Sequence, residues 1–240
     1  MTSIEEKEQA EMLKPINAIL KDFELCNSLY VRDIWSESEV QKELSLTDSE
    51  LYECAIGASK FVLFPEELDD WIIKIPIKGF LEYENQRNVF TKSSEALPNE
   101  TRYNSWDYCE TEEKIYNAAK ALGIEHMFAE TRYIGTKDKY PIYISEKMYD
   151  IGDFKDNYKV KLLPEVEDLL CKMYGYIPDD EWEFIPSDVF QEMYKAYGKQ
   201  NVIKFVTFLA AEGIRDFHTF NFGWSLAGEP VIIDYAGFFD

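Results

Sequence analysis

Cysteine and histidine are scarce in this chain. Among 240 residues there are two histidines and four widely spaced cysteines without a C-x-x-C pair: Cys26, Cys54, Cys109 and Cys171. Zinc sites and disulfide frameworks both rely on closely patterned cysteines or histidines. The sequence therefore argues against a zinc centre, a histidine-rich metal site and a disulfide-stabilised scaffold.

Positive charge is also in short supply. Lys and Arg number 25 against 46 Asp and Glu, which gives a formal net charge of −21 at pH 7. Such a surface would repel a phosphate backbone, so we expect no nucleic-acid partner. An acidic surface is also an ordinary route to solubility, and that simpler interpretation holds unless a basic partner is found.

Long apolar runs are missing as well. No stretch approaches the ~20 apolar residues of a membrane span. Residues 1–9 are polar and acidic, unlike a secretory signal, and no internal repeat is visible. We therefore expect a cytoplasmic protein without membrane contact.

Core-forming residues, by contrast, are plentiful. Hydrophobic residues make up 46% of the chain and aromatic residues 15%, enough for one large domain or two small lobes. Apolar spacing predicts an N-terminal helix within 4–29, interrupted at Pro15. Residues 51–64 predict two strands joined by a tight turn at 57–59, and W-I-I-K-I-P at 71–76 predicts a third. Three successive strands indicate an antiparallel sheet.

The rest of the chain shifts from strands to helices. The pattern predicts a short helix and an irregular loop at 79–105, a helix at 106–122 ended by Gly123, strands at 128–135 and 140–148, and helices at 164–174 and 187–211 ended by Gly213. The sequence thus predicts an α+β fold, with a β-rich front lobe and an α-rich back lobe meeting near 147–153.

Lys74 lies in the middle of an apolar predicted strand, between Ile73 and Ile75. Burying a lysine is costly unless a carboxylate or a phosphate lies nearby. The next predicted helix offers Glu112, three residues before Ile115 and so roughly on its core-facing side. The alternative is a lysine at a strand edge whose ammonium reaches water.

Two acids and an amide stand close together near the end of the sequence. Asp216 and Asn221 are five residues apart in I-R-D-F-H-T-F-N-F-G, and Asp234 follows the apolar run V-I-I. Such a set could orient a hydroxyl and hold Mg²⁺ on a nucleoside triphosphate. Each residue alone would more often be a turn or cap residue.

Gly57 lies in the predicted turn at 57–59. It could let backbone N–H groups approach a phosphate, but it is equally explained as an ordinary hairpin glycine.

In chain order, the hairpin glycine, I-I-K, E-E-K-I-Y, Y-I-S-E, R-D-x-x-x-x-N and I-I-D-Y-A-G resemble the protein kinase-like superfamily over roughly 50–240. The segment D-F-H-T-F-N is similar to the D-x-H-x-x-N of aminoglycoside and choline kinases, whereas Arg215 resembles the protein kinase form. The resemblance implies a two-lobed kinase-like fold with a helical extension at 1–45, a nucleotide-binding lobe at 46–149 and a truncated α-rich lobe at 150–240. Its compactness suggests a phage or mobile-element origin.

The resemblance also gives roles to the residues that could carry chemistry. Asp216 would orient or deprotonate the acceptor hydroxyl, and Asn221 and Asp234 would bind Mg²⁺. Lys74 would hold the phosphates of ATP, with Glu112 as its ion-pair partner.

Further positions would hold the nucleotide. Backbone groups of the hinge at 145–148, including Glu146 and Met148, would bind adenine, and Gly57 and Ser59 would approach the phosphates. The glycine-rich loop is reduced to 57–59, so we expect looser phosphate cover.

Two further departures concern the acidic motif and the segment after it. The motif reads D-Y-A-G, where protein kinases have D-F-G, and the sequence ends six residues after Asp234. It contains no activation segment, A-P-E motif or substrate-platform helix beyond that motif. We therefore expect no peptide recognition of the usual kind, and the N-terminal helix and residues 79–105 are the available substitutes.

The leading hypothesis is an ATP- and Mg²⁺-dependent phosphotransferase acting on a hydroxyl of a protein or small molecule. The alternative is a weakly active or inactive kinase-like scaffold or inhibitor that binds nucleotide and acts through protein contact, its acidic surface serving as a decoy for a basic groove. Nucleotidyl transfer would use the same residue types. A third hypothesis is an unrelated α+β fold with a chance D-x-x-x-x-N.

Overall fold

The structure is a computed structural model, and it describes residues 3–20, 53–56, 59–76, 81–84, 89–92, 101–137, 140–150, 163–174, 187–215 and 221–236. These residues form helices and antiparallel sheets, which confirms the α+β class. Internal contacts divide the chain into two units. The first comprises Met1–Pro98, Ser105–Glu110 and Thr131–Glu146, and the second Asn99–Asn104, Thr111–Glu130 and Lys147–Asp240.

The first unit is built on a five-stranded antiparallel sheet with the strand order β1-β2-β3-β7-β6. Its strands are β1 (Glu53–Ile56), β2 (Lys60–Phe64), β3 (Trp71–Pro76), β6 (Thr131–Lys137) and β7 (Tyr140–Glu146). Isoleucine, valine and aromatic residues dominate them, as the pleated surface of a buried sheet favours. The strands predicted at 51–64, 71–76, 128–135 and 140–148 are thereby confirmed, with small shifts of their ends.

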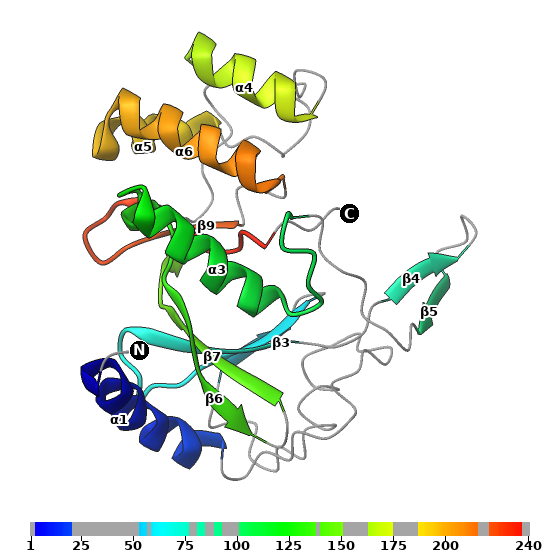
Figure 1. Cartoon of the computed structure of the whole chain (residues 1–240), viewed down its shortest axis with the longest axis vertical. Coiled ribbons are helices and arrows are strands. Elements are labelled where there is room, and N and C mark those ends of the chain that lie inside the picture. Colours follow the sequence, from blue (N-terminus) through cyan, green and yellow to red (C-terminus); the bar gives the residue numbers. More distant parts are fainter. Residues whose placement is uncertain are drawn as a thin grey trace. The chain divides into compact units, whose positions relative to one another are not determined.

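The helix α1 (Ser3–Ile19) runs beside β6 in the first unit (Figure 1). We expected an interruption at Pro15, but the helix continues through it to Ile19. A proline inside a helix costs about 3 kcal/mol. Burial offsets that cost, because Ile16 and Leu20 are fully buried in the same apolar cluster as Ile73 and Ile144.

Residues 79–105 were predicted as a short helix followed by an irregular loop; the helix is wrong, and residues 93–100 of the predicted loop lie outside the described residues. Two strands, β4 (Leu81–Glu84) and β5 (Val89–Lys92), pair there as an antiparallel two-stranded sheet. The segment L-E-Y-E alternates apolar and polar residues, which is the period of a strand, and V-F-T-K begins with a β-branched and an aromatic residue, types that strands favour. The many polar residues between and around them hid that period.

The second unit combines helices with a small sheet. Its elements are α3 (Tyr108–Ala121, which begins in the first unit), a short 3₁₀ helix η3 (Glu125–Met127), β8 (Tyr149–Asp150), α4 (Pro164–Tyr174), α5 (Ser187–Tyr197), α6 (Lys199–Glu212), β9 (Phe222–Trp224) and β10 (Pro230–Ile232). The last three strands form an antiparallel sheet ordered β10-β9-β8. We expected one helix at 187–211; Gly198, with φ +77°, separates α5 from α6.

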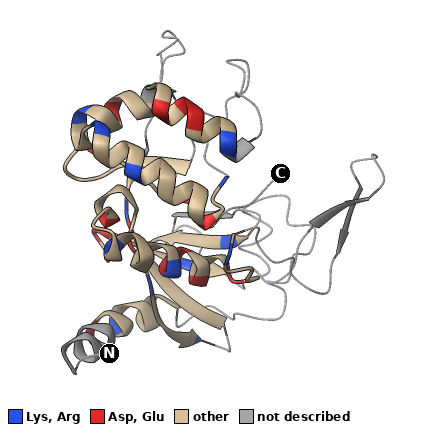
Figure 2. Ribbon diagram, turned by 45° about the horizontal axis from the view of Figure 1, so that its top comes forward, with Lys and Arg blue, Asp and Glu red and all other residues tan. Residues whose placement is uncertain are grey.

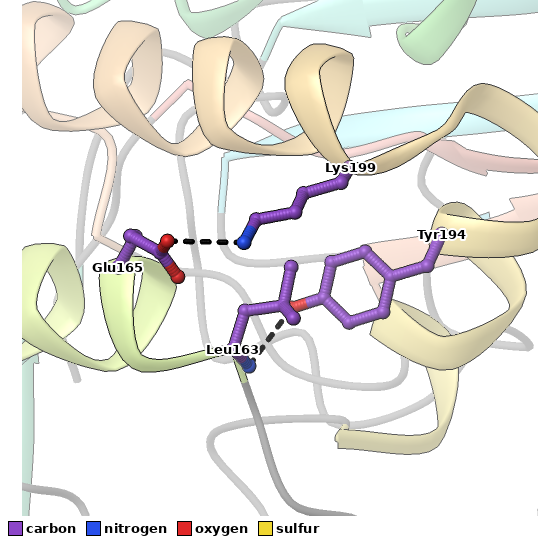
Figure 3. Close-up of polar contacts among 4 residues, drawn as sticks. All are labelled: Leu163, Glu165, Tyr194 and Lys199. Carbon is purple, nitrogen blue, oxygen red and sulfur yellow. Dashed lines mark hydrogen bonds and ion pairs between the residues drawn. The ribbon is translucent and has the colours of Figure 1, made fainter.

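The helices of this unit pack around an aromatic core in which Phe128 contacts the rings of Phe205, Phe208 and Tyr235. At its edge, polar contacts join α4 to the two following helices (Figure 3). Lys199 Nζ lies 3.0 Å from Glu165 Oε1, and the backbone N–H that precedes α4 donates to the Tyr194 hydroxyl at 3.4 Å.

Acidic and basic residues are interspersed along the described helices of this unit (Figure 2). Along α4, for example, Glu165, Glu167 and Asp168 are followed by Lys172. A nucleic-acid site normally presents a basic stripe on one face. Such a mixed distribution fits a solvated surface better than a phosphate-binding one.

Candidate functional site

Lys74 lies in the centre of the first unit's sheet. Its strand β3 is hydrogen-bonded on both sides, with Lys74 opposite Val62 on β2 and Tyr143 on β7. The residue is only 4% exposed, and it faces away from the apolar cluster that takes Ile73 and Ile75. A lysine at a sheet edge reaching water is therefore excluded. Because a buried ammonium is costly without an anionic partner, Lys74 is a candidate to bind a carboxylate or a phosphate.

Tyr143, the cross-strand neighbour of Lys74, donates its hydroxyl to Asp107 Oδ2 at 2.9 Å. Asp107 directly precedes α3, and its other carboxylate oxygen accepts the N–H of Glu110 at 2.8 Å, the geometry of a helix N-cap. Burial raises the pKa of the Asp107 carboxyl above its ordinary value, against the opposing effect of these two hydrogen bonds. A buried acid thus joins the sheet to the first turn of α3.

Sequence reasoning missed Asp107, because it began the helix at Trp106 and so counted this aspartate as a helical residue. The signal was present: an aspartate just before the first apolar-periodic residue is a typical N-cap. Glu112, the predicted partner of Lys74, lies on α3 and is fully buried. Lys74 belongs to the first unit and Glu112 to the second, so their ion pair stays a prediction.

Two predicted metal ligands come to the same end of the β9–β10 hairpin. Phe222 pairs with Ile232, and the N–H of Ile233 donates to the carbonyl oxygen of Asn221 at 2.8 Å. Asn221 thus directly precedes one strand, and Asp234 follows Ile233 at the end of the other. Asn221 is 6% exposed and Asp234 is half-buried. Although thirteen positions separate them, the fold brings their backbones together.

The residue after Asp234 is held firmly. Tyr235 is fully buried, its ring meets Phe128 edge-on at 5.2 Å, and its hydroxyl donates to the carbonyl oxygen of Ala129 at 2.6 Å. Ala129 in turn donates its N–H to the carbonyl oxygen of Ile232 at 2.9 Å. Sequence reasoning noted this tyrosine only as a departure from D-F-G and gave it no role.

The predicted hinge residues lie at the end of β7 and just beyond it. Glu146 ends the strand opposite Trp71, and Met148 precedes β8. A Cβ added to Gly223 would come within 2.6 Å of Met148 Cβ and 3.1 Å of the Tyr149 carbonyl oxygen. Only glycine lets β9 approach β8 this closely.

Upstream of the predicted catalytic loop, α6 ends at a left-handed Gly213 with φ +78°. Here Arg102 Nε lies 2.6 Å from Oε2 of the buried Glu212, and the Arg102 N–H donates to the Glu212 carbonyl oxygen at 3.3 Å. Within the described residues Glu212 Oε2 accepts no aligned hydrogen bond, so this buried oxygen depends on the arginine charge. Asp216 follows three residues after Gly213.

Two predicted site residues, Gly57 and Asp216, lie outside the described residues. Ser59, the last residue of the predicted phosphate loop at 57–59, is buried at 8% exposure. Across the described ranges, no three His, Cys, Asp or Glu side chains gather as a metal site. Asn221 and Asp234 provide one amide and one carboxylate, so they do not form a group of this kind.

None of the helices in the described part of the chain is both long and apolar enough to cross a membrane. No family model, curated protein or solved structure matches this chain.

Proposed function

We propose that this chain is an ATP- and Mg²⁺-dependent phosphotransferase of two-lobed, protein kinase-like architecture, acting on a hydroxyl of a protein or small molecule. The observation that carries the proposal is the meeting of Asn221 and Asp234 at one end of the β9–β10 hairpin. In kinases an asparagine and an aspartate from separate loops hold the metal ions that bridge the phosphates.

The chemistry of the pair fits Mg²⁺. The Asn221 amide and the Asp234 carboxylate offer only oxygen ligands, which Mg²⁺ prefers, and Mg²⁺ sites commonly use one or two carboxylates together with substrate phosphates. A bound Mg²⁺ would supply charge neutralisation to the transferring phosphoryl group. The role of the protein is to hold these two oxygen ligands at fixed positions.

Lys74 supports the same proposal from the first unit. Protein kinases carry their phosphate-binding lysine on the third strand of the sheet and its glutamate partner on the αC helix. Lys74 is buried on the third strand of this chain, and the buried Glu112 lies on α3. Under the proposal Lys74 binds the phosphates, Glu112 orients the ammonium, and Asp216 orients the acceptor hydroxyl. Catalysis would then be mostly positioning and charge stabilisation.

Nucleotide binding is tested by thermal unfolding with and without Mg-ATP. Ligand at about 100 times its Kd stabilises a protein by about 2.7 kcal/mol, which for this size raises Tm by roughly 5–10 °C. Lys74→Met and Asp234→Asn should lose most of that rise. Asp168→Asn, which removes the same charge as Asp234→Asn from an exposed position on α4, should keep it.

The outcomes separate the possible functions. No rise in Tm for the unsubstituted protein counts against the kinase-like assignment. A rise without any transfer of phosphate favours the nucleotide-binding scaffold. A rise that Asp234→Asn leaves intact rejects the metal site at the hairpin end.

A further inference from the structure

We infer that Tyr235 is a positioning residue whose hydroxyl fixes Asp234 as a metal ligand; the inference rests on the proposed function. Tyr235 is adjacent to Asp234 in the chain and among the largest fully buried side chains described. Its hydroxyl ties the end of the acidic motif to the segment after η3 through the Ala129 carbonyl, at 2.6 Å.

Backbone and side-chain contacts hold the chain on both sides of Asp234. Before it, the Ile232 carbonyl accepts the N–H of Ala129, and the N–H of Ile233 donates to Asn221. After it, the Tyr235 hydroxyl donates to the same Ala129, at its carbonyl oxygen. Ala129 is therefore a common anchor for the residues that flank Asp234.

The ring and the hydroxyl of Tyr235 do different things. The ring fills the core against Phe128, with centroids 5.2 Å apart and planes at 81°. A phenylalanine could provide that packing equally well. Only the hydroxyl supplies a donor to the buried Ala129 carbonyl, and it specifies one position of the backbone beside Asp234.

Fixing a ligand in advance improves metal binding, because the cost of ordering the ligand does not fall on the binding step. A buried hydrogen bond contributes on the order of 1 kcal/mol, or about fivefold in an equilibrium constant. Losing the hydroxyl should therefore raise the Mg²⁺ concentration required for ATP binding about fivefold.

Tyr197 offers a matched control. Its hydroxyl also donates to a backbone carbonyl in this unit, that of Pro230 at 2.9 Å. Pro230 begins the strand β10, whose other end leads to Asp234. Tyr197→Phe and Tyr235→Phe thus each remove one hydroxyl bound to the same strand region, at opposite ends.

The experiment measures the Mg²⁺ concentration that gives half of the ATP-induced rise in Tm, for the unsubstituted protein and both variants. It also measures hydrogen exchange of the amides at 231–236 without ligand. We expect Tyr235→Phe to need about fivefold more Mg²⁺ and to exchange faster at these amides. Tyr197→Phe should match the unsubstituted protein in its Mg²⁺ requirement.

The outcomes distinguish this inference from the function it rests on. If the unsubstituted protein shows no Mg-ATP response, the proposed function fails and the inference with it. If it responds and the two variants need the same Mg²⁺ concentration, only the role of Tyr235 is overturned. Should Tyr235→Phe not fold, Phe128→Leu loosens the ring and keeps the hydroxyl. An unchanged Mg²⁺ requirement in that variant supports the inference, because the hydroxyl then holds Asp234 without the full ring packing, and a raised one assigns the effect to the ring and overturns it.

Discussion

The buried carboxyl of Asp107 should give stability a distinctive pH dependence. Burial raises its pKa in the folded protein above the unfolded value of about 3.9, so the folded state binds the proton more readily. Its contribution to stability is then full below about pH 3.9 and is lost as the pH rises through the folded pKa. Asp107→Asn keeps an N-cap acceptor and removes this titration.

We therefore expect Asp107→Asn to gain in unfolding free energy relative to the unsubstituted protein between pH 4 and pH 7, as measured by urea unfolding. Asp107→Ala also removes this titration but loses the cap, so it should be about 1 kcal/mol less stable than Asp107→Asn across the same range. A constant difference between the asparagine variant and the unsubstituted protein at every pH would contradict the assignment.

The ion pair at the end of α6 is another contribution that can be measured at a single residue. Arg102 is 55% exposed at its side chain and Glu212 only 5%, so the pair is intermediate between exposed and buried. Exposed pairs contribute at most about 1 kcal/mol, and breaking buried ones costs about 3–5 kcal/mol. Arg102→Met should cost about 2 kcal/mol in urea unfolding.

Lys195→Met serves as its control, because Lys195 and Glu192 form an exposed i,i+3 pair at 2.5 Å on α5. That change should cost well under 1 kcal/mol. Equal losses for the two variants would show that the burial of Glu212 does not matter. Glu212→Gln, which removes the buried charge itself, should be milder than Arg102→Met.

At single residues, the sequence allowed some predictions and not others. For Lys74 the sequence left two alternatives open, a buried ammonium and a strand-edge ammonium that reaches water, and the structure shows the buried one. The tie between Asp107 and Tyr143, 36 positions apart, could not be predicted. Such pairs depend on which strands lie beside which helix, and local sequence patterns do not predict these long-range contacts.

Among the glycines of the described ranges, Gly223 at the contact between β8 and β9 leaves the least room for an added Cβ. Alanine at Gly223 would place its Cβ 2.6 Å from Met148 Cβ, so one of the two strands must shift. Overpacking of this kind costs about 1–3 kcal/mol. We expect Gly223→Ala to show that loss and faster hydrogen exchange at 222–224.

Gly228→Ala separates the clash from backbone strain. Gly228 has φ +73° in the turn between β9 and β10, and nothing lies within 4 Å of an added Cβ. Gly228→Ala should lower the unfolding free energy by about 1 kcal/mol, with little change in hydrogen exchange at 222–224. If the two variants behave alike, close packing of β8 on β9 is not what requires Gly223.

The strands of the first unit were predictable because β-branched and aromatic runs are short and bounded by turns. The errors have equally physical causes. At 79–105 polar residues masked two four-residue strands, and at Pro15 tertiary burial outweighed a local preference. The predicted helix at 187–211 ran through Gly198 without a break, whereas the positive φ of this glycine separates two helices.

For the whole molecule, the division into units follows contacts and not chain order. Residues 99–104 and 111–130 belong with the second unit although they precede the strands β6 and β7 of the first. Prediction along the sequence yields continuous segments, such as 1–45, 46–149 and 150–240. Contacts between distant segments determine the units, and local sequence patterns do not predict these contacts.

The net charge of −21 gives a prediction for the molecule as a whole. Like charges repel most at low salt, and the Debye length falls from about 30 Å at 0.01 M to about 8 Å at 0.15 M. Added KCl should therefore raise Tm over this range, by about 2–4 °C for each kcal/mol gained, and the rise should level off above it. A Tm independent of salt would show that self-repulsion does not limit stability.

The central claim is that this chain transfers a phosphoryl group by means of Asp216 and the hairpin-end pair. The most direct measurement is label transfer from γ-labelled ATP with Mg²⁺, to the chain itself or to acceptors in a lysate. We predict transfer by the unsubstituted protein and by Asp168→Asn, and a loss of about 100-fold or more in both Asp216→Ala and Asp234→Asn. Absence of transfer from the unsubstituted protein, or transfer that survives in either site variant, would contradict the account.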